Sequence, residues 1–175
     1  MKLKETIIGK IPSDWDIVEA QEYCFQVTDG THDSPKRITF GKYLITSKHL
    51  KEHSLDFLNA YYISENDYKE IIKRSKVDKF DILISMIGTI GEVYIEKTDQ
   101  VDYAIKNIGL FKLNGAKDKA FWLYHYLRSD KAINHIYSQK RGSTQEYITL
   151  DSLRKFPIPL PTLPEQRAIA EILSS

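Results

Sequence analysis

With 175 residues, 42% of them hydrophobic and 28% charged, the chain has the size and composition of one folded domain, which excludes a disordered protein. Its formal net charge of +1 gives no sign of the strongly basic character that many dedicated nucleic-acid-binding domains have. Cys24 is the only cysteine and no apolar run reaches the ~20 residues of a transmembrane helix, so an internal disulfide is excluded and we expect a cytoplasmic protein without membrane contact.

The charges are unevenly distributed along the chain. Residues 31–53 contain five Lys and Arg against two acidic residues, and residues 128–155 contain six against three. Residues 60–99 reverse this balance, with six basic residues against eight acidic ones. Two basic segments that flank an acidic one can place positive potential on one side of a fold, although ordinary solvated surfaces would give the same counts.

The first part of the chain contains turn, strand and helix signals. Residues 28–31, Thr-Asp-Gly-Thr, are typical of a turn. The aromatic and β-branched residues of 40–47 predict a strand. Ser64 resembles an N-cap with an acidic first turn, and it predicts a short helix that includes Tyr68 and Ile72.

The middle of the chain predicts a β-hairpin and one further strand. Residues 81–87 form an apolar run typical of a buried strand. A Gly-Thr-Ile-Gly turn at 88–91 then leads into a returning strand at 93–95. Residues 104–113 predict another single strand, which Gly109 weakens in its middle.

The later part of the chain changes to helical periodicity. Apolar residues recur at intervals of three and four from 118 to 138, with a predicted break at Ser129. Thr149 resembles the cap of a short helical turn. The prolines of residues 156–161 exclude a central strand, because proline removes ladder donors, and they predict an extended connector.

The final segment predicts a helix that serves as a docking element. Thr162 and Glu165 have the spacing of a capping box, with Pro164 in the first turn. Little sequence remains to cover the apolar face of this helix, so we expect it to bind a partner and not to form part of the domain's own core. The expected partner-binding residues are Leu163, Ile169, Ile172 and Leu173.

The chain contains no recognisable catalytic motif. It lacks the tetrapeptide that amino-methyltransferases use around the target base, a Gly-x-Gly for a nucleotide cofactor, a phosphate-binding loop and the nuclease pattern of Pro-Asp with Glu-x-Lys. His49 and His53 have a spacing that can hold zinc, but Leu50 breaks the metalloprotease pattern, so surface or DNA-facing histidines are favoured. We therefore expect no catalytic residue, metal or cofactor in this chain.

Four segments, in this order along the chain, closely resemble segments of the specificity subunits of type I restriction–modification systems. They are residues 28–32 with Pro35, residues 81–85 with 88–91, residues 142–145 with Ile148, and residues 157–170. Residues 11–15, Ile-Pro-Ser-Asp-Trp, also match the way in which a target recognition domain of that family begins.

The resemblance implies an α/β (α+β) fold, with a mixed, largely antiparallel sheet, peripheral helices and the start of a C-terminal spacer helix. Residues 1–161 would be one DNA target recognition domain, and residues 162–175 would begin the spacer and dimerisation helix. Full-length members of the family carry two recognition domains held apart by long helices, and this chain resembles one domain plus the first turns of one helix.

In function, the resemblance implies a non-catalytic subunit that directs partner subunits to one half of a bipartite DNA target. The implied partners are double-stranded DNA, the methyltransferase (modification) subunit, the restriction/translocase subunit and a second copy of the chain, bound through the C-terminal helix. S-adenosylmethionine, ATP and Mg²⁺ are expected on the partner subunits. Two alternatives remain open: the recognition domain of a fused methyltransferase–nuclease, and a protein-interaction adaptor that binds no DNA.

Loop residues are the candidates for DNA contact, because Lys and Arg bind phosphates while forked or amide side chains read bases. Arg37 and Arg141 could address guanine, and Gln145 could address adenine. The candidate DNA-binding residues are Thr31, His32, Lys36, Arg37, Lys48, His49, Lys51, His53, Lys140, Arg141, Ser143, Thr144 and Gln145. Some of them could brace the loops instead, above all Thr31, His32, Ser143 and Thr144, which belong to segments that recur in a family whose targets differ.

Aromatic residues near position 124 offer a second way to contact bases. Trp122, Tyr124 and Tyr126 could act as stacking platforms, but their spacing beside Leu123 and Leu127 is more typical of a buried helix face.

Overall fold

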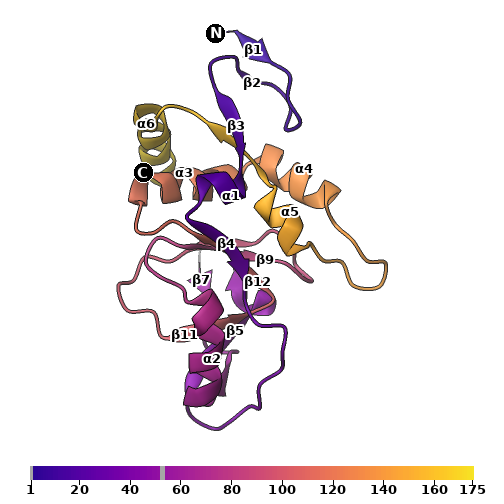
Figure 1. Cartoon of the computed structure of the whole chain (residues 1–175), viewed down its shortest axis with the longest axis vertical. Coiled ribbons are helices and arrows are strands. Elements are labelled where there is room, and N and C mark those ends of the chain that lie inside the picture. Colours follow the sequence, from indigo (N-terminus) through magenta and orange to yellow (C-terminus); the bar gives the residue numbers. More distant parts are fainter. Residues whose placement is uncertain (1, 52–53) are drawn as a thin grey trace.

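The computed structural model describes residues 2–51 and 54–175, and both termini lie in the same half of an elongated α/β fold (Figure 1). The strands are β1 (Leu3–Lys4), β2 (Ile11–Pro12), β3 (Asp16–Glu19), β4 (Gln26–Asp29), β5 (Lys42–Thr46), β6 (Leu50–Lys51), β7 (Ser54–Leu55), β8 (Tyr61–Ile63), β9 (Ile82–Ser85), β10 (Val93–Ile95), β11 (Tyr103–Lys106), β12 (Ile108–Lys112) and β13 (Pro157–Leu160). The helices are α1 (Ala20–Tyr23), α2 (Glu65–Ser75), α3 (Lys117–Leu127), α4 (Asp130–Ser138), α5 (Leu150–Arg154), α6 (Leu163–Ser174) and the 3-10 helix η1 (Ser47–His49).

A four-stranded antiparallel sheet, in the order β10-β9-β12-β4, forms the centre of the fold. Side chains of a strand alternate between its two faces. Ile82 and Ile84 of β9 therefore pack toward the helices, whereas Leu83 packs with Leu110 and Ile105 on the opposite face. Burial on both faces explains why the sequence of this strand is continuously apolar.

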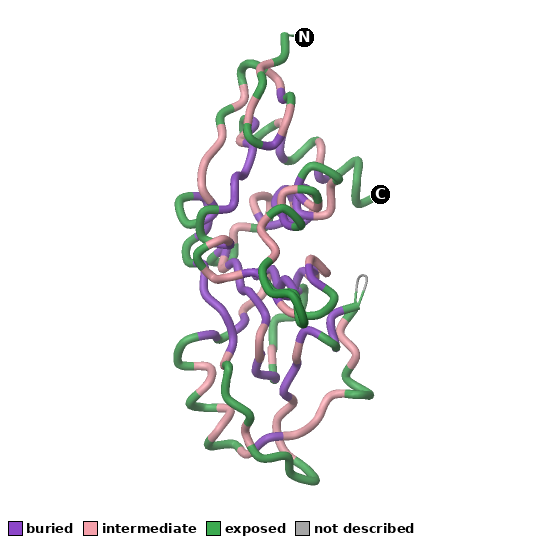
Figure 2. The backbone as a smooth tube through the Cα atoms, turned by 90° about the vertical axis from the view of Figure 1, so that its right-hand side faces the viewer, coloured by how far each residue is buried: buried purple, intermediate pink, exposed green. Residues whose placement is uncertain are grey.

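A second sheet, in the order β11-β5-β8, packs beside the first. Its β11 and β5 run parallel, while β5 and β8 run antiparallel. One face carries Ile45 and Ile105, which pack with residues of the four-stranded sheet, and the other face, with Leu44 and Ile63, is covered by α2. The layers are thus α2, the mixed sheet, the antiparallel sheet and the helices α3 to α5, and Figure 2 shows buried backbone running through the middle of this stack.

Most of the expected elements are confirmed, and the caps form as the sequence predicts. The hydroxyls of Ser64, Ser129 and Thr149 accept hydrogen bonds from backbone N–H groups at the starts of α2, α4 and α5. The capping box at Thr162 begins α6, and the hairpin of β9 and β10 is antiparallel. The mixed, largely antiparallel architecture that we expected is also confirmed.

The prediction of one strand over residues 104–113 is wrong. Asn107 has a positive φ of 55° and separates β11 from β12, which belong to different sheets. Asparagine tolerates this left-handed conformation better than most residues. Gly109, where the sequence suggested a weak point, lies inside β12, and a Cβ there would meet Leu153 at 2.3 Å. It is therefore a close-packing position and not a break.

The predicted turn at residues 28–31 is also wrong in part, because Thr28 and Asp29 belong to β4. The chain bends only after Asp29, where Gly30 lies against β11. A Cβ on Gly30 would lie 2.2 Å from the carbonyl oxygen of Ile105, so no larger residue fits without a backbone shift.

The extended connector predicted near residues 156–161 is more ordered than expected. Residues 157–160 are extended, but they pair antiparallel with β3 in a two-stranded sheet. This pairing agrees with the restriction of proline to positions outside central strands, because within residues 2–51 and 54–175 neither strand of the pair has a second neighbour. Trp122, Tyr124 and Tyr126 are buried in the helical layer, so they are core residues and not stacking platforms.

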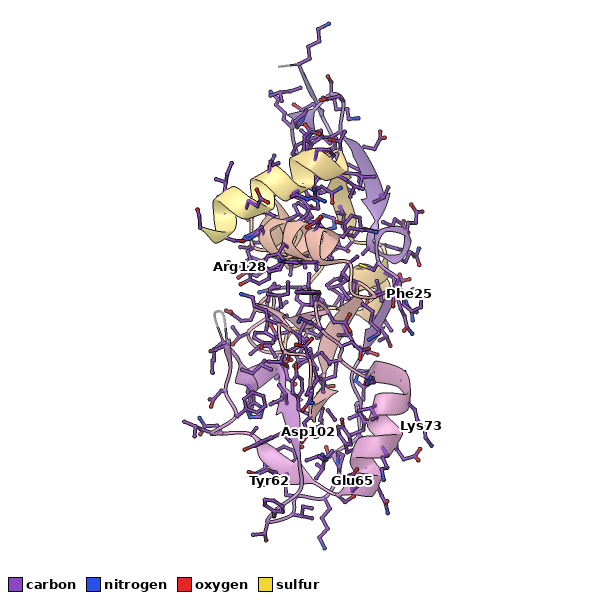
Figure 3. The ribbon with its side chains drawn as sticks, turned by 90° about the vertical axis from the view of Figure 1, so that its left-hand side faces the viewer. Phe25, Tyr62, Glu65, Lys73, Asp102 and Arg128 are labelled. Carbon is purple, nitrogen blue, oxygen red and sulfur yellow. The ribbon has the colours of Figure 1, made fainter. Side chains whose placement is uncertain are left out.

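The expectation that α6 stays outside the domain's own core is wrong for one face of the helix. Gln166 and Ala170 are buried, and Ile169 packs against the main hydrophobic cluster. The carboxylate of Asp118, on α3, accepts two hydrogen bonds from the guanidinium of Arg167, and the two helices lie side by side (Figure 3). The remaining apolar residues are exposed: Leu163 (58%), Ile172 (72%) and Leu173 (57%).

No helix among the described residues is both long and apolar enough to cross a membrane.

Replacement of Gly30 tests the close approach of β4 to β11. We expect Gly30→Ala to lower the free energy of unfolding by about 1–3 kcal/mol, because the added methyl group overpacks against a backbone oxygen. Gly115→Ala is the control: its Cβ would meet nothing within 4 Å, and only the strain of a φ of 76° remains, at a cost of about 1–2 kcal/mol. Urea denaturation followed by circular dichroism measures both, and a loss below about 1 kcal/mol for Gly30→Ala would contradict the prediction.

Candidate nucleic-acid interface

Six segments that are distant in sequence surround one open hollow of about 560 Å³, which we name the loop groove. Its lining residues lie within 34–37, 46–49, 59–61, 87–89 and 106–107, together with Gln145. Two of these segments adjoin strands of the mixed sheet, since η1 follows β5 and the loop after β7 leads into β8, and a third is the turn of the β9–β10 hairpin of the antiparallel sheet. The groove therefore lies where loops from both sheets meet.

Several of the predicted DNA-binding residues meet in this groove. Arg37, Lys48, His49 and Gln145 line it. The other described candidates do not line the groove: Thr31, His32, Lys36, Lys51, Lys140, Arg141, Ser143 and Thr144. Of these, Lys51 lies in β6, and the others belong to the loops next to the groove. His53 lies outside the described residues. Of the two basic segments, residues 31–53 contribute Arg37 and Lys48 to the lining, whereas residues 128–155 contribute only the uncharged Gln145.

The groove has a positive character. Arg37, Lys48 and Lys106 contribute cations, and no acidic side chain of the described chain lines it. Within the described residues, no carboxylate lies within 4.0 Å of these three cations. Lys140 differs from them, because its ammonium group forms an ion pair of 2.7 Å with Glu146. Unpaired cations keep their attraction for an external anion, so this lining favours a polyanion.

His49 braces the groove wall rather than presenting a free ring. It is buried, and its Nδ1 accepts a hydrogen bond of 3.0 Å from the backbone N–H of Thr46. The ring also hydrogen-bonds the backbone of Asn59. Burial lowers the pKa of His49 below its usual value, which keeps the imidazole neutral near pH 7. The ring therefore caps the start of η1 through Thr46 and ties η1 to the neighbouring loop through Asn59.

His32 also has a bracing geometry. Its Nε2 lies 2.9 Å from a carboxylate oxygen of Asp29, and its Nδ1 lies 2.9 Å from the side-chain oxygen of Asn107. The Asp29 side chain is only 4% exposed, and it also receives a hydrogen bond from Arg74 of α2. We name these four residues, Asp29, His32, Arg74 and Asn107, the Asp29 cluster. It ties β4, α2 and the β11–β12 turn together beside the groove.

The second predicted loop forms a small hairpin attached to β9. Arg141 and Tyr147 exchange two backbone hydrogen bonds of 2.8 and 2.9 Å, and Gly142 supplies the positive φ of 87° for the turn. The backbone N–H of Ile148 donates to Met86, next to the end of β9. The side chains of residues 143–145 are exposed and make no hydrogen bond with the described residues, which leaves Gln145 available to a ligand.

Sequence analysis missed several residues of the groove. Tyr61, Thr89, Lys106 and Asn107 line it, but they fall in stretches whose local pattern indicates only strands or a tight turn. Only the alternation of Tyr61 with the buried Ile63 could have indicated a special role, and that pattern is common to every half-buried strand. Among the described residues no group of three or more His, Cys, Asp or Glu side chains is positioned to hold a metal ion.

The fold and the groove define a domain that presents loops for binding, and comparison with known proteins identifies its family. Residues 37–175 match the model described as the type I restriction modification DNA specificity domain, so the chain belongs to this family. The resemblance inferred from the sequence is thereby confirmed.

Curated relatives agree with this assignment. The chain is 29% identical over 177 residues to the MjaX specificity subunit and 26% identical over 189 residues to the MjaVIII specificity subunit, type I restriction enzyme subunits of Methanocaldococcus jannaschii. Both alignments cover 98% of this chain but 41% of the relative. The chain thus spans about two fifths of the length of these relatives.

Solved structures show the same fold. The HsdS subunit from Thermoanaerobacter tengcongensis matches with a TM-score of 0.62 and 19% identity, over 94% of this chain and 37% of that one. A chain from a type I R-M system studied for its assembly and conformational transition matches with a TM-score of 0.65 and 22% identity, over 94% and 38% of the two chains. The α/β architecture is therefore that of a specificity-subunit domain.

The Asp29 cluster can be tested by removing its cation. We expect Arg74→Ala to lower the free energy of unfolding by about 1–3 kcal/mol, because a buried carboxylate loses a charged hydrogen-bond donor. Lys73→Ala is the matched control: Lys73 projects from the outer face of α2 (Figure 3), and among the described residues its one ion-pair partner is the exposed Glu70, so its loss should cost less than about 1 kcal/mol. Equal losses in urea denaturation would show that the cluster adds nothing beyond a surface ion pair.

Proposed function

We propose that this chain recognises DNA as part of a type I restriction–modification specificity subunit and reads one half of a bipartite target. The observation that carries the proposal is the loop groove, which Arg37, Lys48 and Lys106 line without carboxylate partners among the described residues, beside the amide of Gln145. Cations bind the phosphate backbone and give affinity, while an amide or a guanidinium can read base edges. The groove offers both kinds of side chain from rigidly braced loops.

The family supplies the biological setting of this proposal. Its relatives are named as specificity subunits of type I restriction enzymes. We propose that this chain likewise directs a methyltransferase subunit and a restriction/translocase subunit to DNA. S-adenosylmethionine, ATP and Mg²⁺ would be bound by those partner subunits. The chain itself would neither methylate nor cleave DNA. The names of the relatives disfavour a fused methyltransferase–nuclease or a protein adaptor.

Salt-dependent binding of duplex DNA tests the proposed interface. The chain should bind non-specific duplex with a Kd of about 10⁻⁴–10⁻⁶ M at physiological salt. Replacement of Lys36 and Arg37 by Ala should weaken binding and flatten the plot of log K against log salt by about 1 for each phosphate that is no longer neutralised. Replacement of Lys140 and Arg141 should act in the same direction, but by less, because Lys140 is already paired with Glu146.

The control for this titration removes two cations from elsewhere on the surface. Lys69 and Lys73 of α2 pair with Glu65 and Glu70, and their replacement by Ala changes the net charge by the same amount. The control variant should keep the parental salt slope. If it weakened binding as much as the Lys36 and Arg37 variant, net charge and not the loop groove would determine the affinity.

The exposed residues of α6 provide a second surface, for which we propose contact with a partner helix. Large apolar side chains that remain exposed together commonly mark an interaction site. Ile172→Glu with Leu173→Glu should leave the fold intact and abolish self-association of the chain, because both residues are largely exposed. Ile169→Glu should instead lower the melting temperature, since Ile169 packs against the core.

Sedimentation and thermal unfolding together distinguish the two roles of α6. A parental chain that is strictly monomeric at all concentrations would contradict self-association. If the Ile172 and Leu173 variant unfolded as readily as the Ile169 variant, the exposed face would belong to the domain's own packing.

A further inference from the structure

A cation–π pair stands on the wall of the loop groove. The guanidinium carbon of Arg37 lies 4.2 Å from the centroid of the Tyr61 ring. Both residues line the groove, Arg37 is exposed, and Tyr61 is half-buried at the start of β8. No hydrogen bond or ion pair to a described residue occupies the Arg37 side chain, so the ring is its principal contact.

The backbone beside Arg37 is held against β8, which fixes the position of the pair. The N–H of Ile38 donates a hydrogen bond of 3.0 Å to the carbonyl of Tyr62, next to the ring that Arg37 covers. Gly41 allows the same segment to run along β8, since a Cβ there would lie 2.3 Å from the carbonyl oxygen of Ile63. Tyr62 lies at the end of the molecule opposite α6 (Figure 3). Arg37 is thus presented from a braced segment and not from a loosely attached loop.

A guanidinium that stacks on a ring through its face keeps its N–H groups free at its edge. The planar fork of arginine then needs little further ordering to make two parallel hydrogen bonds. Guanine presents two acceptors, O6 and N7, in the major groove, and a bidentate arginine is the commonest specific contact to this base. A lysine offers a point charge and cannot reproduce the fork.

The other basic candidates lack this combination. Arg141 makes no ring contact within the described part of the chain. Lys140 lies 4.2 Å from the centroid of Tyr137, but its ammonium group is paired with Glu146. Lys48 lines the groove as an exposed point charge. The sequence makes Arg37 and Arg141 equivalent candidates, and the structure separates them.

We propose that Arg37, stacked on Tyr61, reads one guanine of the target through O6 and N7, and that Tyr61 is a positioning residue that orients the guanidinium. This inference rests on the proposed function of the groove in DNA recognition. It goes further by committing to one reader, one base and one supporting ring.

Selection of duplexes from a random library by the whole chain, followed by sequencing, measures base preference at every position. The parent should enrich a motif with a guanine at one position. Arg37→Lys should reduce discrimination at that position alone by about 5- to 150-fold, the loss expected for one bidentate contact. The salt slope should not change in this variant, because the charge is kept.

Tyr61 is tested with variants that separate the ring from the hydroxyl. Tyr61→Leu should reduce discrimination at the same position, and Tyr61→Phe should restore it, since the ring is retained. Arg141→Lys is the matched control and should leave the motif unchanged. Circular dichroism confirms folding, and Tyr61→Met, which also removes the ring, replaces Tyr61→Leu if the latter does not fold.

Replacement of the selected guanine by 7-deazaguanine removes the N7 acceptor and completes the test. The parent should lose affinity for this duplex, whereas Arg37→Ala, which has no donor at this position, should bind both duplexes equally. Salt-dependent binding without any enriched guanine, or a guanine preference that survives Arg37→Ala, contradicts the inference and leaves the proposed function standing. Normal discrimination without the ring contradicts the role of Tyr61. Absence of salt-dependent binding by the parent contradicts the proposed function itself.

Discussion

The buried carboxylate of Asp29 is the constraint on which the arrangement of the loops depends. A carboxylate cannot remain buried at low cost without charged or hydrogen-bonding partners. Its partners come from two other parts of the chain: Arg74 from α2 and His32 from the loop after β4. Arg74 also donates to the backbone carbonyls of Asp29 and Gly30, so one guanidinium satisfies three acceptors. The end of β4, the helix and the loop can therefore occupy only one arrangement relative to one another.

This arrangement joins the two sheets. Gly30 donates to Ile108 and Thr31 donates to Ile105, so the segment after β4 follows the turn between β11 and β12 closely. The hydroxyl of Ser47 donates to the carbonyl of Asn107, which brings η1 to the same turn. Loops of both sheets are fixed around one hollow, and a binding site formed by such loops gains affinity because little order has to be created when it binds.

The residues of the groove divide into those whose polar groups are used within the protein and those whose groups are free. His49 and Asn107 of the lining, and His32 beside it, make hydrogen bonds inside the fold. Among the described residues, the side chain of Gln145 makes no hydrogen bond, and that of Arg37 makes neither a hydrogen bond nor an ion pair but stacks on a ring. A family that recognises different targets on one scaffold requires this division, because bracing residues can stay constant while reading residues vary.

Local chemistry determined much of the fold from the sequence alone. The caps at Ser64 and Thr162 and the buried β9 hairpin depend on neighbouring residues, so their signals lie within a few positions of one another. The break at Asn107 and the partners of Asp29 were not readable, because they depend on contacts between residues up to 75 positions apart. Charge counts indicated a shared face for two basic segments, but only the tertiary structure placed Arg37 on Tyr61 and used the ring of His49 for bracing. A side chain's type is written in the sequence, whereas its availability to a ligand is decided by the neighbours that folding gives it.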